Sequence, residues 1–454
     1  MSFFTITSKG DEIHPLPSNP QSPLATTEQH QMKNPNTIMA PSTAISITRA
    51  DLAAFMSTAL TSAHITSVRH LASYNWLASP TPTIGVPGIP PLWTSTITSP
   101  QRVPKDTGHV YIAQNAARHP TSPLEPLFRA LFTENPDFDI GKIDVVSDRN
   151  NVRKLLSFVD DSTAKNGLED FVIKAEAIEG TVVLSRVEER VEEVIGANEF
   201  KGYGHEFEKA CTSNEVEGST GHHRIVRFEF GGLGFIVRHE TDGYVGGFGG
   251  VVDQGEAELD KDDLELLDWL EKLSLEAAAG VAAGPIPGSK MTLKLTGRQV
   301  PRTSTLEIKT RVAHKPIAFD EVASQLWVSQ TPKLVRAYHV KGLFNVPVVE
   351  DMTAALKKWE GEKQESLVAL AALIKKILEV IKEYGQAVIR YDKGVDKLMI
   401  TPEKTAKMLP HDLYLKWKDG NTSREEANEG TAKDNPIVDG KDGEEEEGAN
   451  SDGA

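Results

Sequence analysis

The chain has 454 residues, a formal net charge of −16 at pH 7 and a hydrophobic fraction of 39%. Its mean hydropathy of −0.32 is typical of a soluble protein, and no apolar run approaches the ~20 residues that span a bilayer, so we expect no membrane association. The N-terminus has no basic segment followed by an apolar core, so we expect no secretory signal. The single cysteine, Cys211, cannot form an internal disulfide, and we therefore expect a cytoplasmic or nuclear protein.

Composition predicts a single α+β domain between two disordered ends. Residues 1–45 are rich in Pro, Ser, Thr, Asn and Gln without periodicity, and residues 418–454 form an acidic tail whose ending, "GEEEEGANSDGA", lacks apolar residues to bury. The tail carries much of the negative charge, so the predicted domain, residues 46–417, is only mildly acidic. An acidic and then Ala/Gly-rich stretch, residues 253–289, is interpreted as an insertion.

In chain order, the first half of the predicted domain mixes helices with extended segments. A short helix is expected in 47–63, with Thr48 as its N-cap. The proline-rich stretch 79–94 is expected to be extended and to lie over a surface, because proline disfavours helix and central strand. A helix is expected in 124–136, and 142–159 reads as a strand, a turn and a short helix.

The second half predicts the strands of a mixed sheet and the helices beside it. Two strands, 223–230 and 233–245, should form a hairpin through the glycine pair at 231–232. Further elements are a helix in 200–212, strands in 291–297 and 305–312 that resume the sheet, a helix leading into a strand in 319–342, a long amphipathic helix in 364–385, and a closing hairpin in 386–403. The fold class is therefore α+β, a mixed central sheet flanked by helices.

Ionisable side chains are spaced two apart in two of these strands. Residues i and i+2 of a strand point to the same face, so Glu240 and Asp242 should share a face, and so should Glu307 and Lys309. If the two strands pair, three carboxylates converge, and a divalent cation would relieve their repulsion. A lysine beside them can orient a metal-held water or offset charge on a phosphate.

Together with neighbouring motifs, this layout resembles the decapping exoribonuclease family within the PD-(D/E)xK nuclease superfamily. Three motifs occur in the family's order, namely "GYGHEFE" (202–208), "HETDG" (239–243) and "LEIKT" (306–310). "IDVVSDRNNVRKLL" before them resembles the family's early arginine segment, and "QLWVSQTPKLV" after them resembles its closing helix. The resemblance covers residues 140–350. The gap between the second and third motifs is longer than in the family, and no glycine follows Arg149.

The resemblance implies a nuclease-like core that hydrolyses RNA 5′ ends with Mg²⁺ or Mn²⁺. The metal ligands it implies are Glu208, Glu240, Asp242 and Glu307. The catalytic residues are Lys309 and Glu307, with Gln330 (or else Gln325) steadying the attacking water. The expected contacts to RNA, or to another nucleic acid, are Arg149, Arg311 and His222 (or else His223).

Two other functions were weighed against this hypothesis. A nuclease fold without activity could serve as an RNA-binding or scaffold module, with helix 364–385 or the acidic tail as a surface for a protein partner. An all-α prenyl diphosphate synthase is rejected, because the pairs Asp160-Asp161 and Asp262-Asp263 lack the further aspartate of its motifs and the centre of the chain is rich in strands.

Overall fold

The structure is a computed structural model, and it describes residues 44–56, 60–94, 97–164, 167–246 and 284–418. The predicted disordered ends and the predicted insertion at 253–289 fall almost entirely outside these residues, so the predicted domain boundaries stay predictions. In the described part, no helix is both long and apolar enough to cross a membrane.

The larger of two main sheets is mixed. Its strands are β1 (Ile45–Ile47), β2 (Thr66–Leu77), β3 (Thr83–Gly88), β7 (Val145–Asp148), β8 (Phe171–Ile178), β9 (Thr181–Val187), β12 (Ser219–Phe230), β13 (Leu233–Glu240), β15 (Gly284–Pro285), β16 (Thr292–Gly297), β21 (Gln386–Asp392) and β22 (Lys397–Pro402). Across the sheet they follow the order β1-β22-β21-β8-β9-β7-β13-β12-β2-β3-β16-β15. At the centre β7 runs parallel to both β9 and β13, whereas β12 pairs antiparallel with β13.

A second sheet was not predicted. It holds β4 (Leu92–Trp93), β5 (Gln101–Arg102), β11 (Thr212–Ser213), β14 (Gly243–Tyr244), β17 (Thr305–Val312), β18 (Lys333–Val340), β19 (Leu343–Phe344) and β20 (Val349–Asp351). β17 was expected to resume the first sheet, but it pairs with β14 and β18 instead. A separate two-stranded ribbon joins β6 (Gly108–Tyr111) to β10 (Glu192–Ile195).

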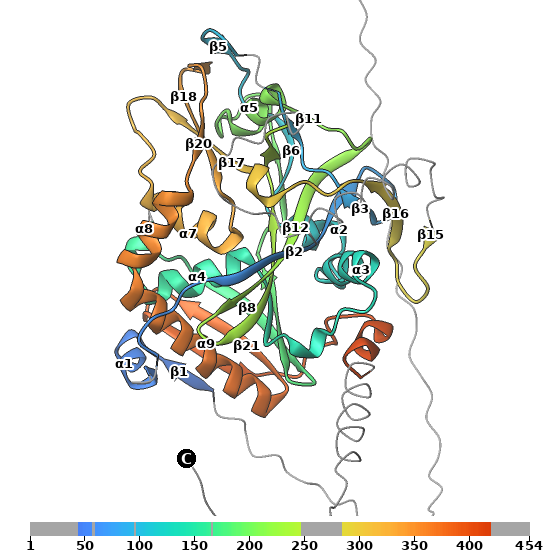
Figure 1. The fold of residues 1–454 in the computed structure, drawn as a ribbon, viewed down its shortest axis with the longest axis vertical. Coiled ribbons are helices and arrows are strands. Elements are labelled where there is room, and N and C mark those ends of the chain that lie inside the picture. The colour runs from blue at the N-terminus through green and yellow to red at the C-terminus, as the bar shows by residue number, and fades with distance from the viewer. Residues whose placement is uncertain (1–43, 57–59, 95–96, 165–166, 247–283, 419–454) are drawn as a thin grey trace, which may run out of the picture. The chain divides into compact units, whose positions relative to one another are not determined.

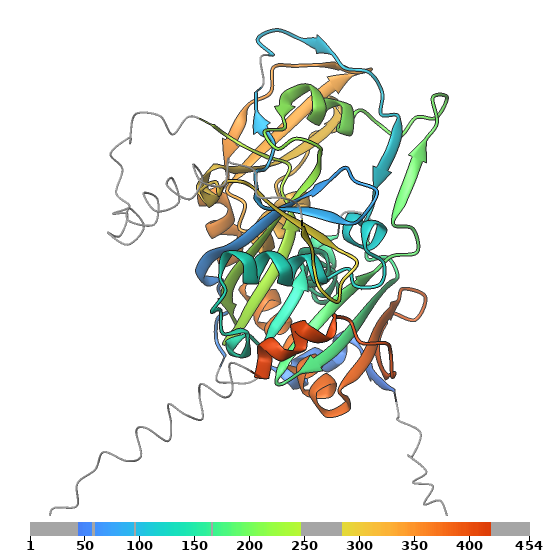
Figure 2. The same ribbon diagram turned by 90° about the vertical axis from the view of Figure 1, so that its right-hand side faces the viewer.

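Helices flank the sheets as predicted. The α-helices are α1 (Leu52–Phe55), α2 (Gln114–Arg118), α3 (Glu125–Glu134), α4 (Arg149–Val159), α5 (Gly204–Cys211), α7 (Asp320–Ser329), α8 (Thr353–Glu362) and α9 (Gln364–Tyr384), and short 3₁₀ turns span Arg49–Asp51, Ile140–Lys142, Asp161–Thr163 and Arg302–Ser304. Against the large sheet, α4 and α9 pack on one face and α3 packs on the other (Figure 1). In both views the second sheet and α5 lie at the upper end of the described part, and α9 lies toward the lower end (Figures 1 and 2). The predicted α+β class is confirmed.

The central strands are apolar on both sides because helices cover both faces of the large sheet. In β7, Val145 packs in the core under α4 and α9, and Val146 packs in the core under α3. In β13, Val237 packs in the core under α4 and α9, and Ile236 packs in the core under α3. Alternate residues of one strand therefore enter two different cores, as the period of two requires.

Local signals predicted several elements well. The hairpin between β12 and β13 turns at Gly231 and Gly232, whose φ angles of 60° and 77° suit a two-residue turn of right-handed twist. The long helix α9 ends before Gly385, which has a φ of 78°. The apolar stripe of α9 is buried in the protein's own core, so that face is not available to a protein partner. The acidic tail, the other predicted surface for a protein partner, lies outside the described residues.

Two expectations in the N-terminal part are wrong. Thr48 does cap the first turn, but the helix ends at Phe55, and residues 66–77 form the long strand β2, which the sequence did not reveal. The proline-rich stretch includes β3, which is paired on both sides. Pro87 lies opposite Thr296 of β16 and has no partner in β2, which pairs only with Ile84 and Gly85 of β3.

A buried ion pair links two central parallel strands. Arg238 of β13 is 1% exposed and donates from Nε and Nη2 to Asp148 of β7, its register partner, at 2.7 and 3.0 Å. Because Asp148→Ala would leave this guanidinium buried without its carboxylate, we expect a loss of about 3–5 kcal/mol in the free energy of unfolding. Urea unfolding measures it. The control is Glu379→Ala, which breaks an exposed pair with Lys376 and should change stability by less than about 0.5 kcal/mol. Equal losses of unfolding free energy in the two variants would show that burial of the Arg238–Asp148 pair has no special effect on stability.

Candidate active site

The four predicted carboxyl ligands meet where the chain passes from one sheet to the other. Glu208 comes from α5, Glu240 ends β13, Asp242 lies between β13 and β14, and Glu307 lies in β17. Gly243 of β14 stands opposite Leu306, so the antiparallel register, continued by one residue, places Asp242 opposite Glu307. The amide N–H of Ile308 donates to Asp242 Oδ2 at 2.7 Å, which fixes that carboxyl against β17.

The strand pairing that was expected to bring these carboxyls together is partly wrong. β13 and β17 were predicted to pair, but they belong to different sheets, and only the short β14 reaches β17. Glu240 and Asp242 were expected on one face of a continuous strand, whereas β13 ends at Glu240. The acids approach Glu307 because the chain crosses between sheets at this point.

Glu307 is the most enclosed of the four carboxylates. Its side chain is 3% exposed, and it accepts hydrogen bonds from Arg149 Nη1 at 3.1 Å and Lys309 Nζ at 2.5 Å. The amide of Gln325 donates to the same carboxylate. Burial alone would raise its pKa, but Lys309 and Arg149 together lower the pKa of Glu307 to about 2. Glu307 is therefore anionic at neutral pH.

The other carboxyls show the mutual repulsion expected of a cluster. Burial, with Glu240 and Glu307 nearby, raises the pKa of Glu208 to about 8, although Lys309 opposes this shift. The pKa of Asp242 is raised well above its usual range by burial and then by Glu307 and Glu208. Loss of water around its carboxyl and the nearby Glu307 also raise the pKa of Glu240, and Arg149 opposes this shift. The cluster thus holds fewer negative charges at pH 7 than its composition suggests.

The donor set fits a hard divalent cation in its chemistry. Carboxylate oxygens are the ligands that Mg²⁺ and Mn²⁺ prefer, and a cation would remove the repulsion that raises the pKa values of Glu208 and Asp242. Within the described residues, however, no three His, Cys, Asp or Glu side chains lie close enough together to hold a metal ion in this arrangement. Arg149, Lys309 and Gln325 bind Glu307 instead.

Three of the predicted site residues are engaged elsewhere. Gln330 adopts a left-handed φ of 54° after α7, and its amide donates to Trp327 O. Arg311 forms an ion pair with Glu321 at 2.8 Å. His222 is buried, with Nδ1 3.1 Å from Asn75 Oδ1. The structure thus places Gln325, the second choice, at Glu307, and does not bring Gln330 to it.

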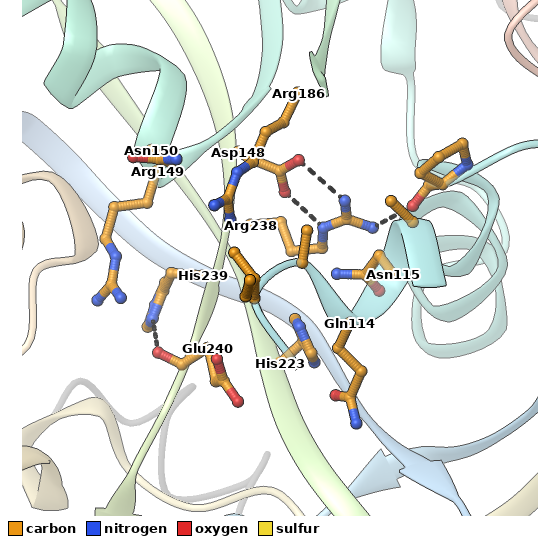
Figure 3. Close-up of a pocket in the computed structure, with 14 residues that line it drawn as sticks. Gln114, Asn115, Asp148, Arg149, Asn150, Arg186, His223, Arg238, His239 and Glu240 are labelled. Atoms are coloured by element: carbon orange, nitrogen blue, oxygen red, sulfur yellow. Dashed lines mark hydrogen bonds and ion pairs between the residues drawn. The ribbon is translucent and has the colours of Figure 1, made fainter. Parts of the chain in front are cut away.

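A cavity of about 100 Å³ lies beside Glu240, where the start of α4, the end of β13 and α2 meet (Figure 3). Three arginines line it, namely Arg149, Arg186 and Arg238. His223 and His239 line it too, and both are buried. Burial and the nearby Arg149 lower the pKa of His239 to about 3, and burial with Arg238 lowers the pKa of His223 well below its usual range. Both imidazoles are therefore neutral at pH 7.

The sequence indicated Arg149, Glu240 and, as the alternative to His222, His223 among the residues that line this cavity, and it missed His239 and Gln114. His239 is the first residue of the "HETDG" motif, and that position was its only signal. Gln114, also on the wall, lies outside every motif.

A comparison with protein families matches most of the chain. A family model described as a domain of unknown function (DUF8563) matches residues 46–416. No curated protein matches the sequence.

Several solved structures match at low identity. The chain is 10% identical to Scheffersomyces stipitis Rai1 in complex with (3′-NADP)⁺ and calcium ion, covering 84% of this chain and 100% of that one with a TM-score of 0.49. It is 10% identical to Candida albicans Rai1 in complex with pU5-Mn²⁺, with 83% and 100% covered and a TM-score of 0.47. S. pombe Rai1 matches at 10% identity, with 80% and 100% covered and a TM-score of 0.46. The resemblance predicted from the motifs is confirmed, and the ligands named are those of the other proteins.

Divalent cations should stabilise the protein by binding the native carboxyl cluster. We expect millimolar Mn²⁺ to raise the thermal midpoint of the wild type by roughly a few degrees, and to raise that of Asp242→Asn much less, because one anionic ligand is lost. Differential scanning fluorimetry measures both. The control is Glu379→Gln, an exposed acid on α9, which should respond like the wild type. A wild-type midpoint that does not move with Mn²⁺ would argue against a metal site.

Proposed function

The chain belongs to the family of the domain of unknown function DUF8563, and we propose that it is a metal-dependent hydrolase of phosphodiester or pyrophosphate bonds at RNA 5′ ends. The observation that carries the proposal is the gathering of four carboxyls and Lys309 at the junction of the two sheets. A cavity lined by arginines adjoins this cluster through Glu240. The order of the motifs is what favours RNA 5′ ends over other phosphate esters.

Glu208, Glu240, Asp242 and Glu307 would hold Mg²⁺ or Mn²⁺. When bound, such a cation draws charge from the non-bridging phosphate oxygens and makes a bound water more acidic. Glu208, with a pKa of about 8, would have to lose its proton to bind the cation, and the raised pKa of Asp242 likewise opposes the anionic form that a cation needs.

Lys309 suits the stabilisation of charge better than the removal of a proton. Burial opposes its positive charge, but Glu307 and Asp242 outweigh burial and raise the pKa of Lys309. The ammonium therefore stays charged at neutral pH, and it can offset the negative charge that builds up on phosphorus-bound oxygens. Gln325 donates to Glu307, whereas Gln330 donates to Trp327 O. Gln325 is therefore the better candidate for steadying the attacking water.

The alternative is a binding module without hydrolytic activity. The observation that favours it is the full set of protein donors on Glu307, supplied by Arg149, Lys309 and Gln325. A carboxylate satisfied in this way has less need of a cation.

Hydrolysis can be tested on four RNAs that differ only at the 5′ end, namely triphosphate, unmethylated cap, nicotinamide cap and monophosphate, each with Mg²⁺ and with Mn²⁺. We expect the wild type to release product from at least one RNA. Glu307→Gln and Lys309→Ala should each lower the rate by at least about 100-fold, because each removes a charge that the transition state needs. Gln330→Ala should retain activity, whereas Gln325→Ala should lose part of it. If all four RNAs survive the wild type under both metals, the binding module takes the place of the enzyme.

Arg149 should contribute to RNA binding through a phosphate. We expect Arg149→Ala to weaken binding of a 5′-monophosphorylated RNA and to reduce the slope of log Kd against log salt by about one unit, because one phosphate contact is lost. Fluorescence anisotropy at several salt concentrations measures this slope. The matched control is Arg390→Ala, a half-exposed arginine on β21 that pairs with Glu403. An unchanged slope in Arg149→Ala would show that this residue makes no phosphate contact.

A further inference from the structure

The helix α5, which carries Glu208, is too short to be stable by itself. It has 8 residues, and isolated helices below about 12–15 residues are marginal in water. Phe207 and Cys211 anchor it in the core of the second sheet. Its first amides need acceptors from elsewhere, because Tyr203 at the N-cap position makes no side-chain hydrogen bond to them. The position of Glu208 therefore depends on what holds the start of α5.

Asp106 supplies these acceptors from a segment far away in the sequence. It lies between β5 and β6 and is only 4% exposed. The N–H of Gly204 donates to Asp106 Oδ2 at 2.9 Å, and the N–H of Glu206 donates to Asp106 Oδ1 at 3.0 Å. The amide of Asp106 in turn donates to Gly202 O at 2.9 Å. Both carboxylate oxygens are thus engaged at the start of the helix, where the helix dipole favours a negative charge.

The two glycines at the start of the "GYGHEFE" motif make room for this contact. Gly202 has a φ of 145°, which other residues rarely adopt, and a Cβ added there would lie 3.3 Å from Asp106 Oδ2. A side chain at this position would therefore crowd the carboxylate. A Cβ added at Gly204 would lie 3.3 Å from Thr310 Oγ1 of β17. The start of α5 is thus held closely against both Asp106 and β17.

This contact determines where Glu208 lies relative to the other carboxyls. Gly204 comes four residues, or about one helical turn, before Glu208, so the two residues lie on the same face of α5. The strand β17, against which Gly204 packs, also carries Glu307. Fraying of the first turn would shift Glu208 relative to Glu307. Groups that act together in a site must be held to within about 0.5 Å of their working geometry.

We propose that Asp106 is a positioning residue, which holds the start of α5 and thereby places the Glu208 carboxyl at the cluster. The two oxygens of Asp106 already accept from amides of α5, so it acts through Glu208 and not as a further ligand. The role of Glu208 as a metal ligand rests on the proposed function. The anchoring of α5 by Asp106 does not.

Thiol labelling in EDTA tests the anchoring without metal. Cys211 is the single cysteine of the chain, is buried and is the last residue of α5, so its reaction with iodoacetamide requires the packing of α5 to open. We expect Asp106→Ala to speed the labelling about tenfold, because loss of a cap destabilises the helix locally. Asp106→Asn keeps one acceptor oxygen and should label at a rate between those of Asp106→Ala and the wild type.

The matched control for labelling is Asp160→Ala. Asp160 Oδ1 accepts from Ser162 N at 3.0 Å at the start of the 3₁₀ turn Asp161–Thr163, so it is a capping carboxylate in another part of the fold. We expect Cys211 of this variant to react at the wild-type rate. Unchanged labelling in Asp106→Ala, or the same acceleration in both alanine variants, would overturn the inference.

Isothermal titration with Mn²⁺ tests whether Asp106 acts through Glu208. We expect Asp106→Ala to weaken Mn²⁺ binding about tenfold, as loss of a residue that orients a ligand does. In the Glu208→Gln background it should cause no further loss, because the carboxylate that Asp106 places is then already absent. Titration to millimolar Mn²⁺ keeps weak binding measurable. The same tenfold loss in both backgrounds would show that Asp106 acts independently of Glu208 and would refute its positioning role. Asp160→Ala should bind Mn²⁺ like the wild type.

The two measurements separate this inference from the proposed function. If the wild type binds no Mn²⁺, the proposed metal site fails, and labelling of Cys211 still decides whether Asp106 holds α5. If the wild type binds Mn²⁺ and hydrolyses RNA but Asp106→Ala changes neither labelling nor Mn²⁺ affinity, the proposed function stands and the inference is refuted.

Discussion

The buried carboxylate of Glu307 organises the junction between the two sheets. With a side chain only 3% exposed, it would cost several kcal/mol to bury without partners. Three donors from three elements meet this requirement, namely Arg149 at the start of α4, Lys309 two residues along β17, and Gln325 within α7. Since α4 packs on the large sheet and β17 belongs to the second, these bonds tie the two sheets together at the site.

The sequence predicted what depends on local pattern. Glu307 and Lys309 do meet, because β17 is a continuous strand in which residues two apart share a face. The same rule failed for Glu240 and Asp242, because β13 stops at Glu240 and the chain changes sheets. The pairing of strands depends on contacts between residues that are far apart in the sequence. The alternation of residues within one strand does not predict this pairing.

The residues missed at the site were missed for a related reason. His239 occurs in a strand, where a histidine is equally compatible with packing in the core, and only the three-dimensional structure shows that it lines the cavity. Gln325 and Gln330 could not be separated by motif position. α7 ends at Ser329, and the left-handed backbone of Gln330 turns its amide back to Trp327, whereas Gln325 remains within the helix and reaches Glu307.

Arg149 connects the carboxyl cluster to the cavity, because it lines the cavity and also donates to Glu307. A cation bound to Glu307 would neutralise the charge that holds this guanidinium, and Arg149 would then be free for a phosphate in the cavity. A phosphate that draws Arg149 away would likewise expose Glu307 to a cation. Under the proposed function, metal and substrate therefore favour each other's binding through one side chain, and linkage requires the effect to be equal in both directions. The ion pair seen between Arg149 and Glu307 is then the resting arrangement that both ligands displace.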